Sequence, residues 1–82
     1  MDQTHSERVE MRVWILVEIA RRRVVRNEII DMSWYTERVV DEGYEKIDLF
    51  FDVFNSIERQ GLIMSEPPHY RLTTAGERFL NT

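Results

Sequence analysis

Apolar residues recur at helical spacing along the first quarter of the chain and predict a helix that is apolar on two sides. One stripe, which we expect to face the core, consists of Val9, Val13, Leu16, Val17, Ala20 and Val24. A second apolar set lies roughly opposite and combines Ile19 with Met11, Trp14 and Ile15. A helix buried on both sides needs a neighbour on each side. We therefore expect Met11, Trp14 and Ile15 to form a seam against another helix of this chain or against a second copy, in preference to a ligand pocket.

Two residues compete to cap the start of this helix. Thr4 and Glu7 have the spacing of a capping box, and Ser6 is the other candidate N-cap. The helix is expected to run to about Arg22. The polar residues 1–5 that precede it are expected to be disordered.

The next segment predicts a short extended link and a second helix. Val24 and Val25 are a β-branched pair, typical of a brief strand or an extended connection. Asn27 is a suitable N-cap, because Glu28 then lies in the first turn, where the helix dipole favours a carboxylate. The pattern leaves the end of this helix open. It either stops near residue 32 and restarts near residue 36, or continues towards residue 41, with Gly43 as the break.

The strongest helical periodicity lies between residues 45 and 60. Ile47, Phe50, Phe54 and Ile57 repeat at i, i+3, i+7 and i+10. A glycine follows at position 61, where a helix C-terminus commonly has one. Phe51 lies near the edge of the apolar stripe, so it is assigned either to the core or to an interface.

The remaining residues predict a β-hairpin and a last helix. Residues 62–64 and 70–72 are two short strand candidates, separated by Pro67 and Pro68, which cannot lie inside a sheet. Thr73 is placed to cap a helix from Thr74 to about Leu80. The predicted fold class is therefore mainly α with a small β-hairpin (α+β), in a single domain that spans residues 1–82.

Composition narrows the class of protein. The 82 residues are 43% hydrophobic and include nine aromatics, as in a folded globular chain. The chain contains no cysteine, so it has no disulfide and no thiolate metal site, which fits a reducing compartment. No apolar run is long enough to cross a bilayer or to serve as a signal peptide. We expect a soluble, cytoplasmic protein that does not bind a membrane.

Two segments resemble the back half of winged helix-turn-helix domains in small bacterial, archaeal and viral transcription regulators. They are residues 57–63 (IERQGLI) and residues 70–80 (YRLTTAGERFL). The resemblance implies a three-helix core with a two-stranded wing and a short C-terminal helix. It also implies that the third helix enters a DNA major groove, that the wing tip at residues 66–69 follows the backbone or the minor groove, and that the start of the second helix near Asn27 meets a phosphate.

The resemblance also implies which side chains touch DNA. With Phe50 inward, the outward stripe of the third helix carries Asp48, Asp52, Asn55 and Arg59, with Glu45 and Ser56 at its edges. Asparagine and arginine are the side chains that read adenine and guanine edges. Asn55, Ser56 and Arg59 are therefore expected to face bases. The expected backbone contacts are Arg26, Asn27, Lys46, His69 and Arg71. Regulators of this kind bind two half-sites as a homodimer, and we expect a homodimer here.

Charge supports an alternative function. The net charge is −4, and residues 44–71 carry three cations against five carboxylates, a net −2. Carboxylates near phosphates oppose the counterion release that drives DNA binding. The alternative is a winged-helix protein–protein interaction module, whose acidic third helix docks a protein partner or mimics DNA. The cluster of Arg21, Arg22, Arg23 and Arg26 suits phosphate contacts and a helix C-terminus equally well.

The sequence offers little from which to build a catalytic or metal site. It has no cysteine nucleophile, no glycine-rich phosphate loop and no pair of histidines at metal-binding spacing. Asp48 and Asp52 lie one turn apart, but two carboxylates favour a solvated face over a cation site. His5 and His69 are expected at the surface. We therefore predict no enzyme activity, no cofactor and no metal, and double-stranded DNA as the partner.

Overall fold

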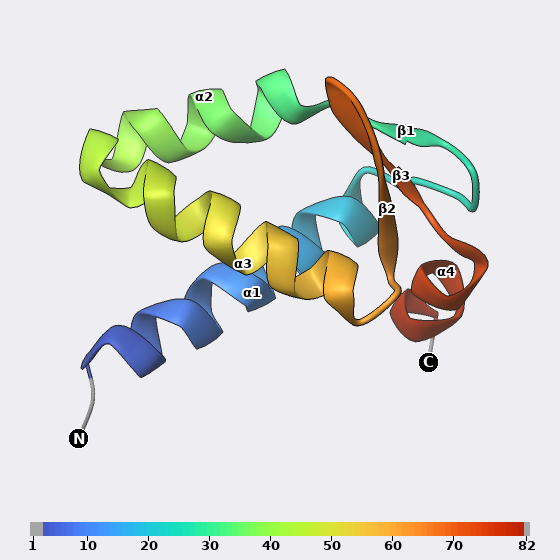
Figure 1. Ribbon diagram of the computed structural model, residues 1–82, viewed down its shortest axis with the longest axis horizontal. Helices are drawn as coiled ribbons and strands as arrows, with labels where there is room; N and C mark the ends of the chain where they lie inside the picture. The colour runs from blue at the N-terminus through green and yellow to red at the C-terminus, as the bar shows by residue number, and fades with distance from the viewer. Residues whose placement is uncertain (1–2, 82) are drawn as a thin grey trace.

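Four helices and one small sheet make up residues 3–81, the part of the chain that the computed structural model describes (Figure 1). The elements in chain order are α1 (Gln3–Arg21), β1 (Ile29–Ile30), α2 (Met32–Glu42), the 3₁₀ turn η1 (Tyr44–Lys46), α3 (Ile47–Arg59), β2 (Ile63–Glu66), β3 (His69–Leu72) and α4 (Thr74–Leu80). The predicted α+β class is confirmed. No helix among these residues is long and apolar enough to span a bilayer.

The sheet has three antiparallel strands where the sequence predicted two. Its order is β1-β3-β2, so β3 lies in the middle and pairs Ile29 with Arg71 and Ile63 with Leu72. The strand considered at Val24 and Val25 lies instead at Ile29–Ile30. The Glu28 N–H donates to the Val25 carbonyl and closes a turn, after which Asn27 and Glu28 hydrogen-bond Leu72 and lead the chain along the free edge of β3 into β1. Ile30 is then buried in the core.

The second helix begins later than predicted. Its N-cap is Asp31, whose carboxylate accepts the Ser33 N–H at 3.0 Å. Asn27 is not a helix cap. It has a left-handed φ of 66°, which asparagine tolerates, and its N–H donates to the Leu72 carbonyl at 2.7 Å. From Met32 to Glu42 the helix is continuous, so it does not stop and restart within this range, and it ends at Gly43.

The first helix buries the opposite face from the one predicted. Ile15 and Ile19 are fully buried, and Met11 and Trp14 pack against the core. Val9, Val13, Val17 and Ala20 are exposed, although Leu16 and Val24 are partly buried as expected. The larger side chains fill the space beside α2 and α3, because their burial removes more apolar area from water. The predicted seam of Met11, Trp14 and Ile15 thus lies within the chain, and Ile15 is not accessible to a second copy.

The ends of α1 also differ from the prediction. The helix begins at Gln3, so residues 3–5 are part of it and do not precede it. Residues 1 and 2 lie outside the described part. Thr4 and Ser6 fall inside the helix and are not its N-cap.

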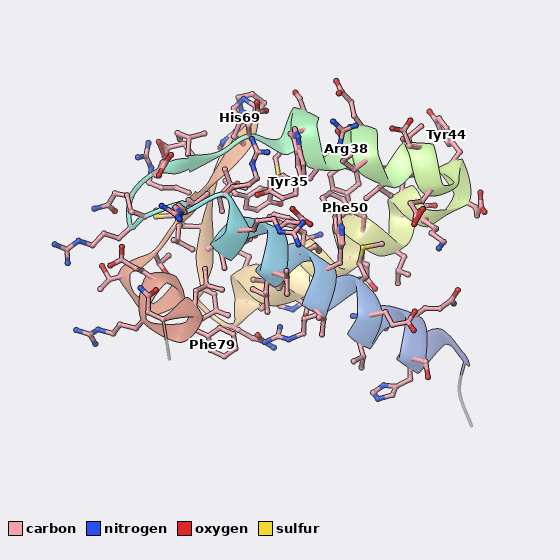
Figure 2. All side chains as sticks on the ribbon, turned by 180° about the vertical axis from the view of Figure 1, so that it is seen from behind. Tyr35, Arg38, Tyr44, Phe50, His69 and Phe79 are labelled. Carbon is pink, nitrogen blue, oxygen red and sulfur yellow. The ribbon has the colours of Figure 1, made fainter. Side chains whose placement is uncertain are left out.

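An aromatic cluster forms the centre of the core. Phe54 lies against Tyr35 of α2, Phe50 of α3 and Tyr70 of β3, with ring centroids 6.3, 5.1 and 4.9 Å apart. Figure 2 shows Tyr35 and Phe50 in the space between the helices. Phe50, Val53, Phe54 and Ile57 are buried along one side of α3, as the periodicity predicted. Phe51 lies outside this core and is 42% exposed.

The last helix packs closely on the base of the hairpin. As predicted, Thr73 caps α4: its hydroxyl oxygen accepts the Gly76 N–H at 2.9 Å, and its hydroxyl donates to the Gly61 carbonyl at 2.6 Å. A Cβ at Gly76 would lie 2.0 Å from the Leu62 carbonyl oxygen and 2.7 Å from Leu72 Cδ1. Only glycine allows this approach.

We predict that Gly76→Ala lowers the free energy of unfolding by roughly 2–3 kcal/mol, because the backbone must move to admit a methyl group. Helix propensity alone predicts the opposite sign, a gain of about 1 kcal/mol. Urea unfolding followed by circular dichroism measures the change. Gly61→Ala is the control: its φ is +83° but no atom lies within 4 Å, so it should cost only about 1 kcal/mol. A stabilised Gly76→Ala variant would contradict the packing described.

Tyr35 predicts a pH dependence of stability at alkaline pH. Burial is the main cause that raises the pKa of Tyr35 to about 12, and Glu18 and Asp31 add to the increase while the Arg22 charge opposes it. The folded state then keeps the proton that the unfolded chain loses near pH 10, so stability falls as pH rises from 10 to 12, by up to roughly 2 kcal/mol. Tyr35→Phe should remove this part of the fall and cost little at pH 7, since the hydroxyl has no hydrogen-bond partner in residues 3–81. Equal pH profiles of the two proteins would refute the assignment.

Candidate nucleic-acid interface

The outward face of α3 has the composition that the helical wheel predicted. Asp48, Asp52, Asn55 and Arg59 are all exposed, opposite the buried phenylalanines. Asn55 and Arg59 are one turn apart on this face. Ser56 is half-buried, and Glu45 lies in η1 just before the helix. The Asn55 and Arg59 side chains are therefore exposed next to each other on α3.

Tyr70 holds Asn55 in place. The Tyr70 hydroxyl on β3 donates to Asn55 Oδ1 at 3.2 Å, while its ring packs on Phe54. Burial, and to a lesser degree the Glu58 charge, raises the pKa of Tyr70. The Asn55 amide group and the second lone pair of its oxygen stay available. This contact was not predicted, because only the fold brings residues 55 and 70 together.

Arginines pair with two of the carboxylates on this surface. Arg8 of α1 forms an ion pair with Asp52 of α3, and Arg71 forms one with Glu66 across the hairpin. Arg71 also donates to the Asn27 carbonyl. Counting Arg8 reduces the net charge of residues 44–71 from −2 to −1. The charge of this surface is thus closer to neutral than the sequence alone indicates.

The hairpin turn is fixed to the start of α2. His69 Nδ1 accepts the Met32 N–H at 3.2 Å and lies 3.9 Å from Asp31. Figure 2 shows His69 where the hairpin meets this helix. A neutral ring that accepts at Nδ1 carries its proton on Nε2. His69 can therefore donate from Nε2, beside the exposed prolines of the turn.

The predicted backbone contacts do not gather at one place. His69 begins β3, whereas Arg26 and Asn27 lie near its other end, where the Arg26 N–H donates to the Glu77 carboxylate at 3.0 Å. They are separated because the second helix starts at Met32 and not at Asn27. Lys46, at the start of α3, is exposed. Arg71 is held by Glu66.

The arginine cluster after α1 is also divided by its contacts. Arg21 lies 3.5 Å from Glu18, and the Arg22 guanidinium lies 4.2 Å from the Trp34 ring centre. Arg23 has a left-handed φ of 58° in the turn. Arg21 thus interacts with the last turn of α1, and Arg22 interacts with the Trp34 ring.

Two aromatic side chains add an apolar component to the same surface. Tyr44 in η1 is 74% exposed and Phe51 in α3 is 42% exposed. They are seven residues apart in sequence, and the boundary between η1 and α3 lies between them. Glu45 and Asp48 lie between them in sequence. The apolar pattern marked Phe51 as an edge residue of the stripe, but nothing in that pattern singled out Tyr44.

Residues 3–81 contain no group of three or more His, Cys, Asp or Glu side chains that could hold a metal ion. No protein-family model matches the chain, and neither a curated protein nor a solved structure matches it significantly.

Proposed function

We propose that this chain is a winged-helix transcription regulator that binds duplex DNA through α3 and the β2–β3 hairpin. The proposal rests on the exposed pair Asn55 and Arg59 on the outward face of α3, with Asn55 held by a hydrogen bond from Tyr70 of the hairpin. The order helix, strand, two helices, hairpin and final helix is compatible with the winged helix that the sequence resembles. In this frame α3 enters the major groove and the hairpin is the wing.

The chemistry of the pair suits base reading. An asparagine amide pairs with both the N6 and N7 groups of adenine, and an arginine pairs with O6 and N7 of guanine. The Tyr70 hydroxyl restricts the rotation of Asn55 before binding, which lowers the entropy lost on contact. Ser56 is less accessible and is the weakest member of the predicted base-facing set.

Few cations are available for phosphate contacts. Within residues 44–72, Lys46 and Arg59 are the cations without an ion-pair partner in the described chain. His69 adds a neutral donor at the wing. With about two phosphates neutralised, log K should fall with log salt at a slope of about −2 per copy. One copy alone binds weakly, so we propose that two copies act together.

The surface for that homodimer is the exposed valine face of α1. Val9, Val13 and Val17 recur every fourth residue and are each about half exposed. Phe79 of α4 lies near this face, since the Arg12 guanidinium is 6.0 Å from its ring centre. Figure 2 shows Phe79 beside α1. A second copy would cover these valines, whereas Ile15 is buried in the core and Met11 and Trp14 pack against it on the side facing α2.

A specific observation favours a second candidate function. Tyr44 and Phe51 are exposed beside Glu45 and Asp48, a combination of aromatic and acidic groups that suits a basic protein partner better than a duplex. In this case the chain is a protein–protein interaction module that docks through η1 and α3. This candidate becomes the better one if folded protein binds no duplex at about 50 mM salt.

The first prediction from this proposal concerns Arg59. The wild-type protein is first used to select its preferred duplexes from a random pool. The difference in binding free energy between selected and non-selected duplexes should then be about 1–3 kcal/mol smaller for Arg59→Ala than for the wild type. Asp52→Asn should bind more tightly than the wild type, because it removes a carboxylate and frees Arg8. Fluorescence anisotropy between 50 and 200 mM salt measures both effects. Arg78→Ala is the control, an exposed cation on α4 that should leave the sequence preference unchanged. Unaltered preference in Arg59→Ala would exclude base reading by this residue.

The second prediction concerns assembly. Sedimentation equilibrium should show a dimer of the wild-type chain and a monomer of Val13→Glu, with both proteins folded by circular dichroism. Val25→Glu places the same charge on an equally exposed valine outside α1 and should remain dimeric. A monomeric wild type at high concentration would refute the homodimer.

A further inference from the structure

A groove of about 610 Å³ lies between α1 and α2 and extends to the start of α3. Its apolar lining consists of Met11, Trp14, Trp34, Val39 and Leu49. Small-molecule sites in proteins have volumes of roughly 300–1,000 Å³ and mostly apolar walls. The lining includes none of Asn55, Arg59 and Tyr70, and it shares only Lys46 with the proposed DNA surface.

The groove contains both tryptophans of the chain. The Trp14 and Trp34 rings are nearly parallel, with an interplanar angle of 6° and centroids 6.4 Å apart. Tyr35 stands nearly perpendicular to both, at 84° and 82°, in the core behind them. Both indoles are half-buried, so part of each ring remains accessible to a flat molecule.

Trp34 already binds cations of its own chain. The Arg22 guanidinium lies 4.2 Å from its ring centre and the Arg38 guanidinium 5.2 Å. Arg38 is labelled in Figure 2 on α2. It is about half exposed, and its ion pair with Asp41 spans 3.5 Å. An exposed ion pair of this kind contributes little stability, so a ligand cation can displace Arg38 from the ring at small cost.

The rim of the groove is acidic. Five carboxylates line it, Glu7, Glu10, Glu18, Asp41 and Glu42, against three cations, Arg21, Arg38 and Lys46. The net charge of the rim is therefore −2. Glu18 and Asp41 are paired with Arg21 and Arg38, whereas Glu7, Glu10 and Glu42 form no ion pair within residues 3–81. These charges favour a positive ligand and oppose a phosphate or carboxylate.

We propose that this groove binds an organic cation that carries a flat aromatic ring. The ring packs against the indoles, and the positive charge lies near Glu7, Glu10 and Glu42. The inference goes beyond the proposed function and does not depend on it, because it uses none of the residues on the outward face of α3.

The test uses intrinsic fluorescence, since the only tryptophans lie in the groove. The full chain, freed of nucleic acid, is titrated with 9-aminoacridine, a flat cation at neutral pH, and with acridine-9-carboxylate, the same ring system with a negative charge. We expect saturable quenching by the cation with one site per chain and a dissociation constant on the order of 10–100 µM. The carboxylate should bind at least tenfold more weakly.

Variants locate the site. Glu10→Gln should weaken binding of 9-aminoacridine by about fivefold, as expected for one charge removed at short range. Glu37→Gln on α2, an exposed carboxylate outside the groove, should have no effect. Trp34→Leu should abolish binding, and calorimetry replaces fluorescence for this variant. Absence of saturable quenching, equal binding of the two acridines, or an unchanged affinity in Glu10→Gln would each overturn the proposal.

Discussion

The packing of Phe54 is the contact on which the arrangement of this protein depends. Its ring lies against Tyr35 of α2, Phe50 of α3 and Tyr70 of β3, so one side chain fixes two helices and the central strand relative to each other. The next residue, Asn55, must then point outward, and Tyr70 is close enough to donate a hydrogen bond to it. Phe54 of the core and Asn55 of the candidate site are thus consecutive residues of α3.

Local signals explain the part of the fold that could be predicted. The spacing of Phe50, Phe54 and Ile57 in α3 and the Thr73 cap of α4 act within a few residues, and the structure confirms them. The predicted start of α2 was wrong because Asn27 suits a left-handed turn as well as an N-cap. The prediction of which face of α1 is buried was wrong because the helix is apolar on two sides, and periodicity alone cannot choose between them. The two-residue strand β1 exists only through its pairing with β3.

The candidate site was predictable in composition but not in electrostatics. The helical wheel identified Asn55 and Arg59 on the outward face of α3. The Arg8–Asp52 pair joins residues 44 positions apart, which no spacing rule relates. The same limitation applies to Arg26 and Asn27, which the turn before β1 carries towards α4. Charge counts along a sequence therefore overstate how acidic this surface is, because they omit partners from other elements.

We propose that duplex DNA is bound by the outward face of α3 and the adjoining hairpin. Nuclear magnetic resonance of the ¹⁵N-labelled protein, titrated with a selected duplex, can locate the bound surface residue by residue. The largest shift changes are expected on the Asn55 side-chain amide, the backbone around Arg59 and the hairpin turn at His69. Changes confined to the turn around Arg23 and to α4, or none in a folded sample, would contradict it.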